Sequence, residues 1–543
     1  MPVRMRLVGV ASLMALAVGP ACASAQQATF EADRLSEHVR ILSQDSFGGR
    51  RPATDGERLT LDYLQAQYEA MGMEPAGPDG QWRQPVTLTR YTPQPGASLT
   101  ASIGQRTVDL VAAGAATVRA AYGDGQASVT NAPVVFAGYG IHAPERDWDD
   151  YGDLDVSGAV VIVMMGEPAD TRFNGEFPTL YSLDLYKTEE AFRRGAAAVL
   201  FVLPIASGDP AFGRAVTQSA LASTTVVGVE NIEATGYLAI DPLTEWAQGS
   251  GLDLERAFAK AENGTFRASV LEGVRLSLNA VETVEEIQTW NLMARIPGTE
   301  RPEETVIVSA HWDHVGSRDT PDSDGDTIYN GAWDNASGTA GVLEMARVLS
   351  SGPAPERTIV FAHMAAEEMG LLGGYYYAEN PIYPLETTVA DINIDMLPLS
   401  PPTRDLPIFG LGQNSLEDDL AALAAEEGRV ITDDGQPEQG FYYRSDHFPY
   451  ALAGVPSLMP WHGVDWDEGG REAGEPAYRQ QWTTRYHRRA DEWSADLDWR
   501  SAVENLELLR RLATDLANSE RWPTWHETSE FAATRAASDA ARR

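Results

Sequence analysis

Histidine and acidic residues that could bind metal ions stand at the ends of apolar runs in the second half of the chain. His311 directly follows one such run, the pair Glu367 and Glu368 lies just past a second, and Asp395 ends a third. Imidazole and carboxylate groups are the ligands that divalent metal ions take in hydrolytic enzymes. The pattern therefore suits a pair of divalent metal ions with a carboxylate base beside them.

The elements that must position these residues are strands of a buried sheet. The run 305–310 is continuously apolar, which is typical of a parallel strand covered on both faces, and 358–364 and 389–395 are predicted to be further buried strands. Helical spacing of apolar residues follows over 338–349 and again over 494–517. This alternation predicts an α/β fold with a largely parallel sheet, whose carboxyl strand ends deliver the metal-type side chains to one edge.

Taken singly, several of these residues have ordinary structural explanations. Asp334 could cap the helix that follows it, and His487 could be a surface histidine. His314 and His363 are expected to pack beside the site without binding metal. Asp395 differs, because an unpaired carboxylate in an apolar strand is costly and a metal ion would relieve that cost.

In order along the chain, these residues stand in a His-x-Asp motif, an Asp-Asn-x-x-Gly motif, a Glu-Glu pair, a strand-end Asp and a late Tyr-His. Together the motifs resemble the zinc aminopeptidases of peptidase family M28. The resemblance implies two Zn²⁺ ions per chain. His311 and Asp395 would bind one ion, Glu368 and His487 the other, and Asp334 would bridge both.

The same resemblance implies roles for the residues around the metals. Glu367 would be the general base that activates a metal-bridged water. Asp313 would orient His311. A segment near residue 445 resembles one that lines the site in the family, and its residues predicted to contact substrate are Tyr443, Asp446 and His447. One departure is that Arg488-Arg489 follows the late histidine where Thr-Pro or similar is usual, so the local substrate surface can differ.

The implied fold is a zinc-peptidase sandwich, a mixed sheet between helices, with an inserted and mostly-β domain. Residues 136–141, 149–151 and 156–158 are similar to the protease-associated domain that the family inserts. The predicted organisation is a signal peptide over 1–25, the N-terminal part of the peptidase domain over 26–94, the inserted domain over 95–275, the catalytic domain over 276–519 and a loose polar tail over 520–543. We expect the inserted domain to limit access to the cleft without supplying a catalytic side chain.

Composition and the N-terminus bear on partners and compartment. A net charge of −38 argues against nucleic-acid binding, which requires clustered Lys and Arg. Arg4 and Arg6, the apolar run 7–18 and the small residues 23–25 together predict a secretory signal, and the run is too short to span a membrane. The single cysteine, Cys22, is a poor match to a lipoprotein site. An exported protein, periplasmic or extracellular and without stable membrane insertion, is therefore expected.

The predicted function is a secreted exopeptidase that removes N-terminal residues from peptides. A carboxypeptidase or dipeptidase on the same scaffold is an alternative, for which Arg444, Arg488 and Arg489 could bind a terminal carboxylate. A glutaminyl cyclase-like transferase with one zinc ion and a catalytically inactive binding protein are further alternatives. The oligomeric state and the preferred substrate side chain stay open.

Overall fold

The computed structural model describes residues 28–120, 123–173, 178–226, 232–321, 323 and 325–542. The predicted signal peptide over 1–25, together with Cys22, lies outside these residues. Within the described ranges, the helices are all too short or too polar to cross a membrane.

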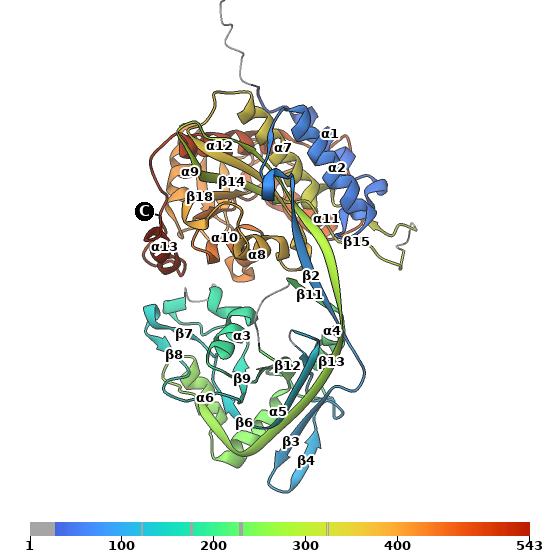
Figure 1. Cartoon of the computed structure of the whole chain (residues 1–543), viewed down its shortest axis with the longest axis vertical. Coiled ribbons are helices and arrows are strands. Elements are labelled where there is room, and N and C mark those ends of the chain that lie inside the picture. Colours follow the sequence, from blue (N-terminus) through green and yellow to red (C-terminus); the bar gives the residue numbers. More distant parts are fainter. Residues whose placement is uncertain are drawn as a thin grey trace, which may run out of the picture.

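Two large hydrophobic cores divide the described residues into an upper and a lower body, joined by a long two-stranded ribbon (Figure 1). The upper body is built on the central strands β14 (Arg301–His311), β17 (Arg357–Met364) and β18 (Thr388–Asn393). β14 lies between β17 and β18 and is parallel to both. The short strand β21 (Ser457–Leu458) extends the parallel arrangement beyond β18, whereas β13 (Ser269–Ile296) pairs antiparallel with β17. The sheet is therefore mixed and largely parallel here, as predicted.

Helices cover both faces of this upper sheet. Val306 and Val308 of β14 join the first core, while the intervening Ile307 joins a smaller core on the opposite face. The first core also takes residues from α1 (Ala32–Leu42), α2 (Asp55–Ala70), α7 (Gly338–Ser350), α9 (Ser415–Glu426) and α12 (Arg500–Ala517). The opposite face is covered by α8 (Leu372–Glu379) and α10 (His447–Leu452), through Tyr377 and Tyr450. Burial on both faces explains why β14 and β17 read as largely apolar runs.

The lower body gathers its core between Leu99 and Ala280. Four of its strands are parallel neighbours, in the order β6 (Gln126–Phe136), β9 (Val160–Met164), β10 (Ala198–Val202) and β12 (Ala234–Leu238). Helices also belong to this body, namely α3 (Asp184–Arg193), α4 (Pro210–Ser219), α5 (Ile240–Ser250) and α6 (Leu254–Ala261). Helix and strand therefore alternate in the region that the sequence predicts as a mostly-β insertion.

The ribbon between the bodies consists of β2 (Arg83–Pro93) and the middle of β13. The two strands pair antiparallel from Arg83 opposite Leu292 to Pro93 opposite Glu282. The first part of β13, before the ribbon, belongs to the lower sheet, where it pairs with β6 and with β3 (Ser98–Ile103). The predicted domain boundary at 275 therefore falls inside one continuous strand.

The C-terminal residues 520–543 were expected to form a loose tail, and this expectation is wrong for the described part of the segment. Trp525 and Phe531 are buried in an aromatic core, and Arg535 in α13 (Ala532–Asp539) is 4% exposed. The Trp525 indole donates to the carbonyl of Gly454, and the Arg535 guanidinium donates to the carbonyl of Thr388. Large aromatic side chains spaced through a polar sequence are sufficient to dock it.

Candidate metal centre

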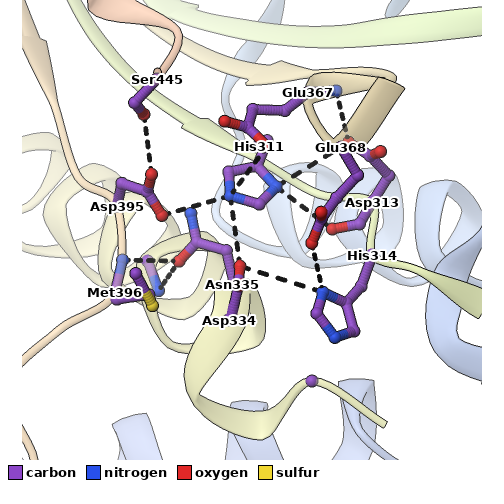
Figure 2. A network of polar contacts seen from close by, with 12 residues as sticks. His311, Asp313, His314, Asp334, Asn335, Glu367, Glu368, Asp395, Met396 and Ser445 are labelled. Carbon is purple, nitrogen blue, oxygen red and sulfur yellow. Dashed lines mark hydrogen bonds and ion pairs between the residues drawn. The ribbon is translucent and has the colours of Figure 1, made fainter. Parts of the chain in front are cut away.

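The candidate metal residues gather at the carboxyl edge of the upper sheet (Figure 2). His311 is the last residue of β14, Glu367 and Glu368 lie in a short turn just after β17, and Asp395 lies two residues beyond β18. Asp334 comes from the irregular segment Ala332–Ser337 that leads into α7. The structure thus brings together residues from four separate segments of the chain, at the edge where ligands bind in open α/β sheets.

One group of side chains surrounds the imidazole of His311. Its Nε2 lies 3.2 Å from Asp395 Oδ1 and 3.6 Å from Asp334 Oδ1. Glu367 Oε2 is 4.0 Å from the same nitrogen. One ligand-type atom from each of His311, Asp334 and Asp395 falls within 4.8 Å of the others, which is close enough for a single ion to touch all three.

A second group shares Asp334 with the first. His487 Nε2 lies 3.1 Å from Asp334 Oδ2 and 3.2 Å from Glu368 Oε2. His314, which the sequence assigned to packing, also reaches this group, because its Nδ1 is 2.5 Å from Glu368 Oε1 and 3.9 Å from Asp334 Oδ1. His314, Asp334 and Glu368 meet the same 4.8 Å criterion. Asp334 is therefore common to two candidate ion positions.

Burial and the close approach of several carboxylates shift the pKa values of the residues in the site. Burial raises the pKa of Glu367 well above its ordinary value. Burial also raises the pKa of Glu368, but the neighbouring His314 and His487 outweigh this effect and lower it to about 2. The His311 ring loses basicity through burial, yet Glu367 and Asp395 hold its pKa well above the usual range. Several buried acids facing a few histidines form a set that divalent cations would neutralise.

The main chain of Asp334 is held by Asp491. The Asp491 carboxylate accepts the N–H groups of Trp333, at 2.9 and 3.0 Å, and of Asp334, at 3.0 Å. Asn335, the next residue, accepts the N–H of Met396 at 3.0 Å and so connects this segment to the residue after Asp395. Fixing the backbone on both sides orients the Asp334 carboxylate toward the two groups.

Arg50 holds the backbone of the same region through hydrogen bonds to its carbonyl groups. Its guanidinium is fully buried and donates to the backbone carbonyls of Leu42, Trp312, Asn330, Gly331 and Asp334, at 2.6 to 3.4 Å. The preceding Gly49 has a φ of +69°, and a Cβ there would lie 2.4 Å from the carbonyl oxygen of Tyr329, so only glycine allows this approach. In the sequence Arg50 follows Gly48 and Gly49, and this neighbourhood does not indicate a buried role for its side chain.

Asp313 and Ser445 support the ligand-type residues, and the contacts of Asp313 differ from the one expected. The Nδ1 of His311 is 3.2 Å from the backbone carbonyl oxygen of Asp313 but 3.8 Å from its carboxylate. That carboxylate instead accepts the N–H of Glu367 at 3.1 Å, and burial raises its pKa to about 7. Ser445 donates to Asp395 Oδ2 at 2.7 Å. Asp313 therefore orients His311 through its backbone and the Glu367 turn through its side chain.

The structure places the three residues predicted to contact substrate in different surroundings. Tyr443 lines the cleft beside the metal residues. Asp446 and His447 are both 0% exposed and neither belongs to the cleft wall, so the structure contradicts a direct contact between them and substrate. They lie at the start of α10, whose first turn faces the interior. The spacing in the sequence could not show this orientation.

The metal residues form one side of a cleft of about 500 Å³. Its remaining walls are mainly aromatic and apolar, and the aromatic members are Tyr375, Phe409, Phe441, Tyr443, Phe448, Trp461, Trp482 and Tyr486. Leu183, Asp184 and Leu185 of the lower body also line it. Of the three arginines considered as carboxylate binders, Arg444 is a lining residue, whereas Arg489 donates to the carbonyl of Thr320.

The part of the chain that carries this site is similar in sequence to known proteins. Residues 291–513 match the model of peptidase family M28. Over 262 residues the chain is 29% identical to aminopeptidase YwaD of Bacillus subtilis, covering 46% of this chain and 52% of the relative. Over 234 residues it is 28% identical to leupeptin-inactivating enzyme 1 of Streptomyces exfoliatus, covering 39% and 48%. The chain spans about half the length of these curated relatives.

A solved structure of similar extent is an aminopeptidase from Aneurinibacillus sp. strain AM-1. It covers 91% of this chain and 95% of its own, with a TM-score of 0.47 and 17% sequence identity.

Proposed function

We propose that this chain, a member of peptidase family M28 through residues 291–513, is a two-zinc aminopeptidase. The observation that carries the proposal is the position of Asp334, which lies within reach of both ligand groups at the floor of the cleft. The relative named as an aminopeptidase supports the same reaction class, and a probable zinc metalloprotease of Pyrenophora teres f. teres, 34% identical over 124 residues, supports the same metal. Imidazole nitrogens and carboxylate oxygens also form a donor set suited to zinc.

The ligand residues divide into two sets around Asp334. His311 and Asp395 would hold one ion, and Glu368 and His487 the other. His314 is fully buried and lies closest to Glu368, so we assign it to holding that carboxylate in place by donating from Nδ1. His487 is 37% exposed and nearly equidistant from Asp334 and Glu368, as expected for a residue that completes a site open to the cleft.

Glu367 is the residue that moves the proton. Its side chain is 11% exposed, lines the cleft and lies outside both close ligand groups. When bound, the zinc ions would supply the Lewis acidity that activates water and polarises the scissile carbonyl. Glu367 would take a proton from that water and then give it to the departing amine.

The charges around the cleft favour the amino end of a peptide. Carboxylates line it, whereas Arg444 is the single arginine or lysine among its lining residues in the described part of the chain. The acids are Asp184, Asp334, Glu367, Glu368 and Asp395. With Asp334, Glu368 and Asp395 bound to zinc, Asp184 and Glu367 would be left to face an α-ammonium group, and Arg444 would be left to face a terminal carboxylate. Arg444 is the specific observation that keeps a carboxypeptidase as the second candidate.

The test compares three substrates on protein of measured zinc content. These are an aminoacyl anilide, its N-acetylated form, and a peptide with an amidated C-terminus. An aminopeptidase loses activity on acetylation and is indifferent to amidation. Loss on amidation with indifference to acetylation would instead assign the chain as a carboxypeptidase and make Arg444 the first residue to mutate.

Export remains part of the proposal, because it depends on residues 1–25 alone. Fractionation of cells that express the full chain, together with N-terminal sequencing of the product, tests whether cleavage occurs before Gln26.

A further inference from the structure

The lower body supplies the cleft wall that faces the metal residues. We call residues 178–185 the wall segment. It contains the short helical turn Leu180–Ser182 and ends at the start of α3, and its residues Leu183, Asp184 and Leu185 line the cleft. Figure 1 shows α3 at the top of the lower body, facing the upper body. Where this segment stands therefore determines how open the cleft is.

One buried carboxylate connects the wall segment to the upper body. The Glu530 side chain is 1% exposed although it lies in the C-terminal segment. Its Oε1 accepts the backbone N–H of Leu180 at 3.0 Å and the hydroxyl of Tyr443 at 2.9 Å. Its Oε2 accepts from the Arg146 guanidinium at 3.1 Å. Glu530 thus contacts the wall segment, a cleft residue of the upper body and a third segment in the lower body.

The Arg146 side chain extends this contact back to the wall segment. Its guanidinium lies 5.2 Å from the ring centre of Tyr181 and 5.5 Å from that of Phe173. It also donates to the backbone carbonyl of Arg172. A buried carboxylate with three donors, one of them charged, is satisfied only while all its partners stay in place. Losing the carboxylate would leave Arg146, the Leu180 N–H and the Tyr443 hydroxyl without their shared acceptor.

The contact matters because the covalent connection between the bodies is a ribbon. β2 and β13 join the bodies on one side of the molecule, so a second attachment near the cleft is needed to hold the wall segment against the metal residues. A cleft of about 500 Å³ falls in the size range that encloses a small ligand, so a fixed wall admits only the end of a peptide.

We propose that Glu530 is a positioning residue that holds the wall segment across the cleft and thereby restricts the enzyme to short peptides and freely extended chain ends. This inference rests on the proposed function. Glu530 touches neither metal residues nor substrate and acts through Leu180 and Tyr443. Releasing it lets the wall segment move away, which opens the cleft to bulkier substrates and weakens the grip on small ones.

The experiment compares Glu530→Ala with the wild-type protein. Glu527→Gln serves as the matched control, because Glu527 is exposed in the same C-terminal segment. The first measurement is amide hydrogen exchange of the wall segment, which needs no substrate. We expect exchange at Leu180 to become about tenfold faster or more in Glu530→Ala and to be unchanged in the control.

The second measurement is the ratio of kcat/KM for a long unstructured peptide to that for an aminoacyl anilide. We expect this ratio to rise about fivefold or more in Glu530→Ala, mainly through opposite changes in KM, at unchanged zinc content. Arg146→Gln, which keeps the carboxylate but removes its charged partner, should shift both measurements in the same direction and serves if Glu530→Ala does not fold.

Unchanged exchange at Leu180, or an unchanged substrate ratio in a folded variant with full zinc content, overturns the inference. A zinc-loaded wild-type protein that cleaves none of the peptides overturns the proposed function instead. In that case the exchange measurement still decides whether Glu530 holds the wall segment.

Discussion

Arg50 offers a strong test of how the candidate metal centre is supported, because its side chain makes no contact with a ligand atom. The guanidinium donates only to backbone carbonyls, and these belong to the end of α1, to the loop after His311 and to the loop that carries Asp334. Burial lowers its pKa to about 10, so the side chain stays charged at neutral pH. Arg50→Met keeps much of the side-chain volume and removes every donor.

The magnitude follows from the number and the burial of those contacts. A hydrogen bond from a charged group contributes about 1.5–3 kcal/mol, and an abandoned buried carbonyl costs about 1–3 kcal/mol. The contributions of the five contacts do not simply add. The substitution also removes the unfavourable free energy of burying a charge, which offsets part of the loss. We therefore expect the free energy of unfolding of the upper body to fall by about 3–5 kcal/mol, and zinc affinity to fall about 10- to 100-fold.

The assay is denaturant unfolding of metal-free and zinc-loaded protein, with a zinc titration against a competing chelator. Arg51→Met is the matched control, because Arg51 is the next residue and has one hydrogen bond, to the carbonyl of Val315 at 3.2 Å. Because Arg51 is partly exposed, loss of this bond should cost about 1.5 kcal/mol, at the low end of the range for a charged donor, and leave zinc affinity unchanged. Arg50→Lys should not restore the wild type, since one ammonium group cannot reach three chain segments.

The reasoning about Arg50 fails if Arg50→Met unfolds within about 1 kcal/mol of the wild type, the size of an ordinary single hydrogen bond. It also fails if stability falls as expected while zinc affinity equals that of the Arg51→Met control. The second result would show that the loops keep their geometry without the guanidinium.

The remaining predictions concern the cleft itself. Glu367→Gln should lower kcat about a hundredfold or more while zinc content, measured by mass spectrometry, stays that of the wild type; retained activity would remove Glu367 as the base. Asp334→Asn should lower the affinity of the protein for both zinc ions. A variant that binds one ion with wild-type affinity would refute Asp334 as a shared ligand. His487→Ala should abolish binding of one zinc ion, whereas His314→Ala should lower the affinity for that ion about 10- to 100-fold without abolishing binding. A larger loss of affinity in His314→Ala than in His487→Ala would make His314 the ligand and His487 the supporting residue. Trp482→Ala should lower kcat/KM about tenfold for anilides of large apolar residues and little for alanine anilide, because the aromatic wall contacts only the larger side chain.

The strands and the convergence of the candidate residues could be predicted from the sequence for one physical reason. A strand buried on both faces need not alternate polar and apolar residues, so β14 and β17 stand out as largely apolar runs with metal-type residues at or just after their ends, whereas β18 carries Asp391 and Asn393 between its apolar residues. The topology of parallel sheets then places those residues at one edge. The α/β sandwich follows from the same alternation.

Other features depend on distances that the sequence does not encode. His314 was assigned to packing because nothing near residue 314 shows that Glu368 lies 2.5 Å away. Arg50 stands in a Gly-rich loop, where an arginine ordinarily faces solvent. Asp446 and His447 were placed in the cleft because the segment resembles a lining segment, but the turn of α10 directs them inward. Only the packed structure decides such orientations.

The antiparallel pairing of β2 with β13 has a consequence for how this architecture can arise. Pro93 and Glu282 are opposite each other in the ribbon, so the chain leaves the upper sheet and returns to it at positions about 5 Å apart. A tight turn joining those two positions would restore an ordinary hairpin and leave the order of the upper strands unchanged. Loss or exchange of everything between them would therefore leave the upper sheet intact, but it would remove the wall segment and with it the partners of Glu530 at Leu180 and Arg146.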